Sequence, residues 1–400
     1  MNTTHKPQIT KIALRVVALL AALVLLLFTL AEIRLAYEPT KQLISGEMSF
    51  AEYTDALQQR MTSDAVGKYA FVNLNGLYCR LTGRNICNQI MRLDNGMLTN
   101  LAPERFDMLP AADGLAELSR FCEDEGADFL FALVPAKLDK NSEILIPGEV
   151  DYSNENGDSL VSALAERGVD TLDLREYLAQ TPEDIEKYFF RTDHHWNFTG
   201  AFAGYQILTQ ELAARYPDAG IDLSLADMDN WQAHTLNNWM LGSQGKRTGV
   251  YFGGTEDVTY YTPLFETHIS CDIPVYSGGS AYYEGSFEEA NVCSEYITGE
   301  PNLFENSPYE MYIGGEYYLV RHRSETAPSD LKLLIIKDSF ALPVQAYMST
   351  QFKYVDVIDP RCEGESVAEY IAQTQPDAVL VLLSSQAAGA YTEYADYGVD

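Results

Sequence analysis

Apolar residues in this chain gather into one long run and several short ones. The long run extends from Val16 to Ala31 and follows basic residues at positions 6, 11 and 15. With Ile12 to Leu14 included, it approaches the ~20 residues that a membrane-spanning helix needs. Because a basic flank stays cytoplasmic, we expect everything after about residue 35 to lie outside the cytosol. A cleaved signal peptide is the alternative, but no clean A-x-A site follows the run, which favours an uncleaved single-pass anchor.

The short apolar runs alternate with helical patterns. Residues 113–126 predict a helix, and residues 127–135 then predict an almost fully apolar strand. The order recurs with a helix before Gly168, a strand at residues 171–174 and a helix at residues 199–216, for which Thr199 is a plausible N-cap. An apolar strand directly after a helix indicates a sheet covered on both faces, so we expect an α/β domain.

The C-terminal part repeats this alternation, but the segment before it differs. Strands are predicted at residues 331–336, 353–359 and 377–385, with helices between them at residues 341–352 and 366–375. Residues 243–325 instead hold many glycines, paired tyrosines and alternating runs such as "VTYYTPLF", which predict a β-rich insertion. The resulting division is a cytoplasmic tip and membrane anchor at 1–35, a helical stalk at 36–67 and an α/β domain at 68–400.

The net charge of the chain argues against two classes of binding partner. It has 58 acidic and 27 basic residues, a net charge of −31. Such a chain repels the phosphates of nucleic acid, and it offers no broad basic patch for an anionic membrane surface. The acidity is best explained as a solubilising surface.

The six cysteines contain no C-x-x-C pair, so a zinc ribbon or thioredoxin motif is unsupported. An even number outside the cytosol permits disulfides, and Cys79 with Cys87 and Cys271 with Cys293 are the nearest pairs in sequence. Free buried cysteines that act as small apolar residues are the alternative.

Ser339 in "LLIIKDSFALP" is the first candidate catalytic residue, because it follows a buried strand where a helix begins. Sheets of this class bind ligands at the carboxyl ends of their strands, and helix N-termini favour anions. A serine there can attack a carbonyl while its own backbone N–H stabilises the oxyanion. The alternative is that Asp338 or Ser339 only caps the helix.

The motif "TDHHW" supplies a base and an acid for such a serine. In an extended segment Asp193 and His195 point to one side and His194 to the other, so Asp193 can orient His195. Trp196 could wall the site and exclude water. Adjacent histidines rarely chelate one ion and no H-x-x-x-H spacing occurs, so we expect neither a metal nor a cofactor. A buried structural histidine cluster is a further alternative.

Together, "TDHHWNFTGAF" and "IIKDSFALP" resemble the DHHW family of bacterial proteins, which is similar to the SGNH-like domains of alginate O-acetyltransferases. The resemblance covers most of the chain after about residue 68. It implies an SGNH-hydrolase-like three-layer sandwich with a mostly parallel sheet and a circularly permuted motif order. Asp193 and His195 then correspond to the D-x-H pair and Ser339 to the nucleophile, while Lys337 stands where the usual serine block has glycine.

The resemblance also implies a function. The expected activity is acetyl transfer through an acetyl-serine to hydroxyls of an exported or cell-surface polysaccharide, with a membrane-bound O-acyltransferase as acetyl supplier. A carbohydrate esterase with the same triad and a non-catalytic polysaccharide-binding or assembly component are the alternatives. Predicted substrate contacts or site walls are His194, Trp196, Lys137, Lys246 and Arg247. Candidates for an oxyanion donor are Gly242, Gly245, Gly314 and Gly315.

Overall fold

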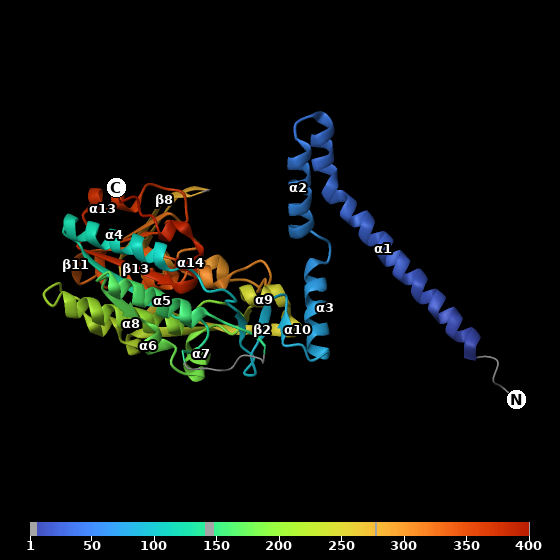
Figure 1. Ribbon diagram of the computed structural model, residues 1–400, viewed down its shortest axis with the longest axis horizontal. Helices are drawn as coiled ribbons and strands as arrows, with labels where there is room; N and C mark the ends of the chain where they lie inside the picture. Colours follow the sequence, from blue (N-terminus) through green and yellow to red (C-terminus); the bar gives the residue numbers. More distant parts are fainter. Residues whose placement is uncertain (1–5, 141–147, 277, 400) are drawn as a thin grey trace. The chain divides into compact units, whose positions relative to one another are not determined.

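The structure is a computed structural model that describes residues 6–140, 148–276 and 278–399 (Figure 1). It divides into two compact units, Met1–Leu74 and Asn75–Asp400. The first unit holds helices α1 (Lys6–Ser45) and α2 (Phe50–Ser63) and the start of α3 (Lys68–Leu81). Within the described residues α1 contains one candidate membrane span, Leu14–Ser45, by length and composition, a test that a signal sequence also passes.

The first unit folds into a helical hairpin. Ser49 caps α2 through a reciprocal capping box with Glu52, which sets the turn between the antiparallel partners α1 and α2. At the end of α2 the backbone N–H of Val66 donates to the carboxylate of Glu32 in α1 (2.7 Å). The residues predicted as a stalk therefore hold the end of α1 and all of α2.

The second unit is built on a mixed sheet that, within the described residues, has eight strands in the order β5-β4-β13-β11-β12-β10-β8-β9. The first five strands pair in parallel and the last three are antiparallel additions. In that order the strands are Thr171–Asp173, Asp128–Val134, Ala378–Ser384, Ser329–Lys337, Phe352–Ile358, Leu319–Ser324, Ile269–Tyr276 and Gly279–Gly285. The predicted α/β class with a mostly parallel sheet is confirmed.

Helices cover both faces of this sheet. On β4, Leu130 and Ala132 join one apolar cluster, whereas the alternate residues Phe129 and Phe131 join another, as expected for a strand buried on both sides. Helices α8 (Phe198–Arg215) and α12 (Ala341–Met348) pack into the first cluster. The second cluster is covered by α4 (Leu109–Glu125), α5 (Ser153–Glu166), α13 (Val367–Thr374) and α14 (Ser385–Ala390).

The remaining elements surround this sandwich. A small sheet contains β1 (Ile86–Cys87), β2 (Ile90–Arg92) and β3 (Leu98–Asn100), and a separate pair contains β6 (Trp231–Met240) and β7 (Glu256–Pro263). Short helices are α6 (Arg175–Leu178), α7 (Pro182–Tyr188), α9 (Ser243–Thr248), α10 (Val250–Gly253) and α11 (Phe287–Asn291), with 3-10 turns at Leu223–Ala226, Met228–Asn230, Ser294–Tyr296, Pro308–Met311 and Thr392–Tyr394. The six cysteines, all within the described residues, are free thiols.

The segment predicted as a β-rich insertion, residues 243–325, holds β7, β8, β9 and β10, and the last three of these extend the edge of the main sheet. One local expectation needs correction. Helix α8 is capped by Asn197, whose side chain accepts the N–H of Gly200 (2.9 Å), rather than by Thr199. The hydroxyl of Thr199 instead lies 2.8 Å from that of Tyr261, so tertiary contact takes this side chain away from the helix end.

Candidate active site

A cavity of about 190 Å³ lies at the carboxyl ends of the parallel strands. Residues just beyond four strand ends line it: Lys137 after β4, Ser339 after β11, Arg361 after β12 and Ser385 after β13. Parallel strands bring their carboxyl ends to one edge, which is why residues far apart in sequence meet here. His194 and Tyr391 also line this cavity.

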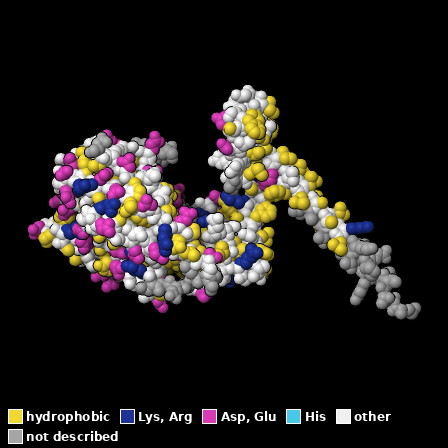
Figure 2. Space-filling model, in the orientation of Figure 1, with side chains coloured by type: hydrophobic (Ala, Val, Ile, Leu, Met, Phe, Trp, Pro, Cys, Tyr) yellow, Lys and Arg dark blue, Asp and Glu magenta, His cyan; other side chains and the backbone are white. Residues whose placement is uncertain are grey.

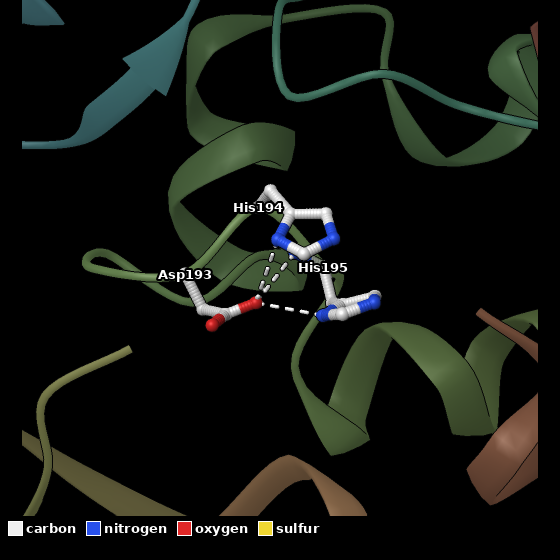
Figure 3. Close-up of side chains that lie close together, drawn as sticks. All are labelled: Asp193, His194 and His195. Atoms are coloured by element: carbon white, nitrogen blue, oxygen red, sulfur yellow. Dashed lines mark hydrogen bonds and ion pairs between the residues drawn. The ribbon is translucent and has the colours of Figure 1, made fainter. Parts of the chain in front are cut away.

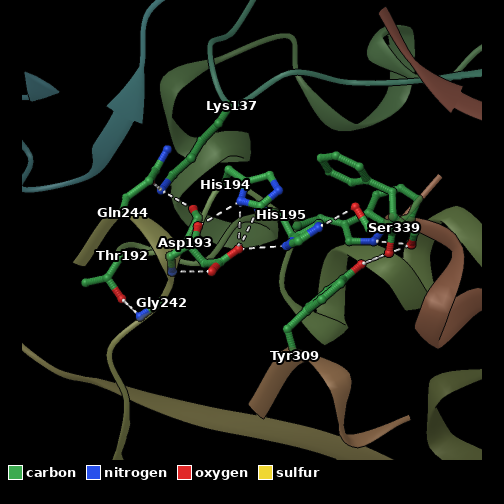
Figure 4. Close-up of polar contacts among 12 residues, drawn as sticks. Lys137, Thr192, Asp193, His194, His195, Gly242, Gln244, Tyr309 and Ser339 are labelled. Carbon is green, nitrogen blue, oxygen red and sulfur yellow. Dashed lines mark hydrogen bonds and ion pairs between the residues drawn. The ribbon is translucent and has the colours of Figure 1, made fainter. Parts of the chain in front are cut away.

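Ser339, His195 and Asp193 form one continuous chain of hydrogen bonds (Figure 4). The Oγ atom of Ser339 lies 2.8 Å from Nε2 of His195, and Nδ1 of the same ring lies 2.7 Å from Oδ1 of Asp193. Asp193 and His195 are buried, while Ser339 is partly exposed and lines the cavity. This arrangement has the geometry of a nucleophile, a base and an orienting acid.

The carboxylate of Asp193 is held as an anion. Burial by itself would raise its pKa, but the charge of His195 and the hydrogen bond to that ring outweigh burial, so the pKa lies well below its usual value. Its second oxygen accepts the backbone N–H of Ser243 (2.6 Å) at the start of α9. Asp193 can therefore stabilise a protonated His195 without taking its proton.

The turn between β11 and α12 fixes Ser339. The carboxylate of Asp338 accepts the N–H of Phe340 (3.0 Å) and both the N–H and the hydroxyl of Ser384 (2.8 Å each), which ties the turn to the end of β13. Among the described residues, the backbone N–H of Ser339 has no hydrogen-bond acceptor. Such an N–H beside the nucleophile can stabilise an oxyanion.

Tyr309 and Trp196 hold the histidine loop against this turn. The ring of Tyr309 stacks on that of His195 (3.8 Å between centroids, 8° between planes), and its hydroxyl donates to the carbonyl of Ser339 (3.0 Å). The indole N–H of Trp196 donates to the carbonyl of Phe340 (2.9 Å). Trp196 is fully buried and does not line the cavity, so the prediction that it walls the site is wrong.

The predicted separation of the two histidines is also wrong. His194 Nδ1 lies 3.4 Å from Asp193, and the two imidazole rings lie 3.7 Å apart (Figure 3). Alternation holds only for extended backbone, and residues 191–195 bend here. The carbonyls of Arg191 and Asp193 converge on the ammonium of Lys137 (3.0 and 2.7 Å), which fixes this bend.

The same cluster offers three potential metal ligands within 4.8 Å, from Asp193, His194 and His195. Both ring nitrogens of His195 are engaged, by Asp193 and by Ser339. A metal ion would have to displace one of these bonds, so the donor set fits a triad better than a zinc site. Nδ1 of His194 is also engaged, 2.8 Å from the hydroxyl of Ser243. Burial and the neighbouring His195 lower the pKa of His194.

The predicted basic contacts lie in different places. Lys137 lines the cavity, but its buried ammonium donates to two backbone carbonyls and to Gln244 (3.1 Å) rather than facing solvent. Lys246 and Arg247 do not line the cavity, and Arg247 donates to the carbonyl of Asn88 (2.9 Å). Their contact with substrate stays a prediction.

The glycine candidates for an oxyanion donor do not fit. The N–H groups of Gly242 and Gly245 donate to Thr192 (2.8 and 2.9 Å), and that of Gly314 donates to Glu310 (2.9 Å). Gly315 does not line the cavity.

Sequence patterns did not single out Arg361 or Tyr391, which also line the cavity. Both oxygens of Asp359 accept from the guanidinium of Arg361 (2.9 and 2.6 Å), and the Tyr391 ring lies 5.5 Å from it. Arg361 follows a strand end, as Ser339 and Lys137 do, and that shared position was the available signal.

Lys337, which replaces the glycine of the usual serine block, belongs to a buried charge network. Its ammonium contacts the carboxylates of Glu316 and Asp359 (3.0 Å for Asp359). Burial lowers the pKa of Lys337, but these two charges outweigh burial and raise it overall. This network links β11 to Arg361 at the cavity. Lys337 therefore has a structural role next to the turn that carries Ser339.

Comparison with known proteins supports this architecture. Residues 102–225, which include Asp193 and His195, match the family described as SGNH hydrolase-like domain, acetyltransferase AlgX. No curated protein sequence matches the chain. Bacillus cereus PatB1 is similar with a TM-score of 0.62 at 22% identity, over 76% of this chain and 98% of that one. A structure of PatB1 with a sulfonyl adduct has a TM-score of 0.61 at 22% identity, over 77% and 99%.

A DHHW family protein from Eubacterium siraeum is similar as well, with a TM-score of 0.54 at 15% identity over 78% of this chain and 95% of that one. The SGNH-like fold and the predicted resemblance to DHHW proteins and SGNH-like domains are thereby confirmed.

Proposed function

We propose that this protein is an extracytoplasmic O-acetyltransferase that moves an acetyl group to hydroxyls of a cell-surface or exported polysaccharide. The observation that carries the proposal is the unbroken chain Ser339–His195–Asp193 at the cavity. The match of residues 102–225 to a family described as an acetyltransferase domain supports the reaction class. The apolar span in α1 supports a membrane-anchored protein with its catalytic unit outside the cytosol.

The reaction proceeds in two balanced steps. Ser339 Oγ attacks the carbonyl carbon of the acetyl donor while Nε2 of His195 takes the hydroxyl proton. The tetrahedral oxyanion is stabilised by the backbone N–H of Ser339, and its collapse breaks the donor bond as His195 protonates the leaving group. A sugar hydroxyl then gives its proton to His195, attacks the acetyl-serine and releases Ser339, which recovers the proton.

The acetyl acceptor and the acetyl supplier are inferred from the family resemblance and from the membrane anchor. A polysaccharide outside the cytosol has no access to cytoplasmic acetyl donors, so we infer a membrane-bound O-acyltransferase that delivers acetyl groups across the membrane. Tyr391, exposed at the cavity, offers a ring face for a sugar. No step of this scheme uses a metal or a cofactor.

Activity assays on the full chain in detergent test the proposal. We expect turnover of p-nitrophenyl acetate that is lost in Ser339→Ala and His195→Ala and that falls about 10⁴-fold in Asp193→Asn. Matched controls at exposed positions are Ser280→Ala and His268→Ala, which should keep full activity. Retained activity in Ser339→Ala, or its loss on adding a chelator, would sink the serine mechanism.

The same assay with a sugar acceptor added separates a transferase from an esterase. With an oligosaccharide present, a transferase yields acetylated sugar, measured by mass spectrometry, whereas an esterase yields only acetate. Absence of turnover in both arms, with unchanged thermal melting, would favour the binding or assembly alternative.

A covalent probe gives an independent test of the nucleophile. Because the similar PatB1 structure carries a sulfonyl adduct, we expect a sulfonyl fluoride to label this protein. Peptide mapping should place the added mass on Ser339, and Ser339→Ala should stay unlabelled. Labelling at a different serine would contradict the assignment.

A further inference from the structure

The first unit brings the chain back to the outer end of the apolar span. The α1–α2 hairpin reverses the chain, and the N–H of Val66 reaches the carboxylate of Glu32 (2.7 Å). Three residues into α3, the ring of Phe71 packs edge-on against Phe28 of α1, with centroids 5.6 Å apart at 85°. Helix α3 therefore begins beside the last turns of the run from Val16 to Ala31.

Those contacts place the start of α3 at a definite depth. A helix rises about 1.5 Å per residue, so Phe28 lies about 6 Å deeper along α1 than Glu32. If the apolar run occupies the hydrocarbon, Glu32 lies at the outer headgroups and Phe28 just below them. A residue that touches Phe28 is then at the depth of about 5–10 Å to which interfacial helices bury their apolar face.

Helix α3 carries an exposed apolar face at this level. Phe71 and Leu74 are each 58% exposed, and the helix continues with Tyr78 and Leu81, which are also exposed. These positions are spaced by three and four residues, so they share one side of the helix. Exposed apolar residues that line up in this way mark an interaction surface rather than a scattered background. The apolar side chains of α1 are visible in Figure 2, and Phe28 of that helix contacts Phe71 of the face.

We propose that α3 is an interfacial helix whose apolar face, Phe71, Leu74, Tyr78 and Leu81, docks onto the outer surface of the bilayer that α1 crosses. The inference rests on α1 being a retained anchor, as in the proposed function. A lipid surface fits this face because the protein's own span brings the bilayer to it. Lys68, in the first turn of the same helix, is a cation that can pair with a lipid phosphate.

Docking of α3 would add a second membrane contact to that of α1. The helix runs from the first unit into the second, so this contact lies in the stretch of chain that joins them.

Depth-dependent fluorescence quenching on the full chain in phosphatidylcholine vesicles tests the inference. Leu74→Trp and Tyr78→Trp add a reporter on the face, and Asp55→Trp adds one at an exposed position in α2 as a control. The signal of each added tryptophan is the difference from the parent protein, which contains three tryptophans. In vesicles with brominated acyl chains, we expect loss of the added fluorescence at 74 and 78 but not at 55.

The outcomes separate the two proposals. Extraction of the protein by alkaline carbonate would show that α1 is not a retained anchor, and the docking inference would fall with it. If the protein stays in the vesicles but the tryptophans at positions 74 and 78 are quenched no more than the one at position 55, the docking of α3 alone is overturned. Protection of 74 and 78 from both brominated lipid and aqueous iodide would show that protein covers the face, which also overturns docking onto lipid.

Discussion

Two aspartates beside the reacting groups have different tasks, and their partners distinguish them. Asp193 binds the histidine ring and the N–H of Ser243, so it orients and stabilises the base. Asp338, next to the nucleophile, binds only the N–H of Phe340 and the end of β13, so it shapes the turn. Adjacency to Ser339 in sequence therefore does not identify the acid of the triad.

Lys137 is the buried ammonium that shapes the histidine loop. It lies three residues beyond β4 and donates to the carbonyls of Arg191 and Asp193 and to Gln244. Burial lowers the pKa of Lys137 to about 7, although the charges of Glu256 and Asp193 partly oppose this shift. A neutral amine keeps two of its three protons as donors, so the loop can stay anchored above that pH.

The free energy of unfolding should depend on pH in a way that reflects the lowered pKa of Lys137. In the unfolded chain a lysine has a pKa of about 10.4, so between pH 7 and pH 9 the unfolded state holds a proton that the folded state has lost. Stability of the native protein should thus rise with pH relative to Lys137→Met. Denaturant unfolding at pH 6, 7, 8 and 9 measures this difference.

Leu138→Met, a neighbouring change without a titratable group, provides the control and should differ from the native protein by a constant amount at all pH values. A difference between native protein and Lys137→Met that stays flat from pH 7 to pH 9 would contradict the buried, shifted lysine.

At the scale of elements, the site depends on how closely α9 approaches the histidine loop. A Cβ atom on Gly242 would lie 2.4 Å from Cβ of Asp193 and 2.7 Å from its backbone nitrogen. Real Cβ atoms do not approach so closely, and no flexible side-chain end is available to move aside. The N-terminus of α9 can therefore donate Ser243 N–H to Asp193 only because residue 242 lacks a side chain.

Gly242→Ala should consequently displace Asp193 and its histidine. We expect the rate of acetyl-ester turnover to fall about 10²-fold, the effect of a misplacement near 1 Å, with the substrate KM little changed. Steady-state kinetics and a thermal melt measure both effects.

Gly168→Asn is the matched control for this change, since Gly168 has a left-handed backbone (φ 74°) with open space around it, and asparagine tolerates that conformation. Its turnover should equal that of the native protein. Unchanged turnover in Gly242→Ala would show that the close approach is not needed for catalysis.

At the scale of the whole molecule, the excess of acidic residues acts on stability rather than on the site. Figure 2 shows acidic side chains spread over the visible face of the second unit, interspersed with fewer basic ones. A net charge of −31 makes the folded state repel itself. Surface charges farther apart than about 10 Å are largely screened at 0.1 M salt, so this repulsion depends on ionic strength.

Raising the salt concentration from about 0.01 M to about 0.1 M at pH 7 should therefore raise the melting temperature, as the Debye length falls from about 30 Å to about 10 Å. Circular dichroism melts of the detergent-solubilised chain measure the shift. Near pH 4.4, the sequence isoelectric point, the net charge is close to zero and the gain should largely disappear. An equal gain at both pH values would point to a general salt effect instead of charge repulsion.

The sequence by itself determined much of this protein, because periodicity and motif order are local properties. Patterns among neighbouring residues predict the apolar run of α1, the alternation of helices with buried strands, and the position of Ser339 after a strand. The type and approximate extent of α4, β4, β11 and β13 were predictable for the same reason.

Only the tertiary structure decided how the site is assembled. The bend that brings His194 beside Asp193 depends on Lys137, which lies far away in sequence, and the burial of Trp196 depends on Phe340. Arg361 joins the site because it follows β12, and parallel strands align their carboxyl ends. Tyr309 comes from the 3-10 turn at Pro308–Met311 and Tyr391 from the end of α14, both distant in sequence from Ser339 or His195. Buried charged groups and carbonyls need hydrogen-bond partners, and where those partners are distant in sequence the backbone departs from the alternation that a local pattern predicts. In this protein such a departure occurs at the site.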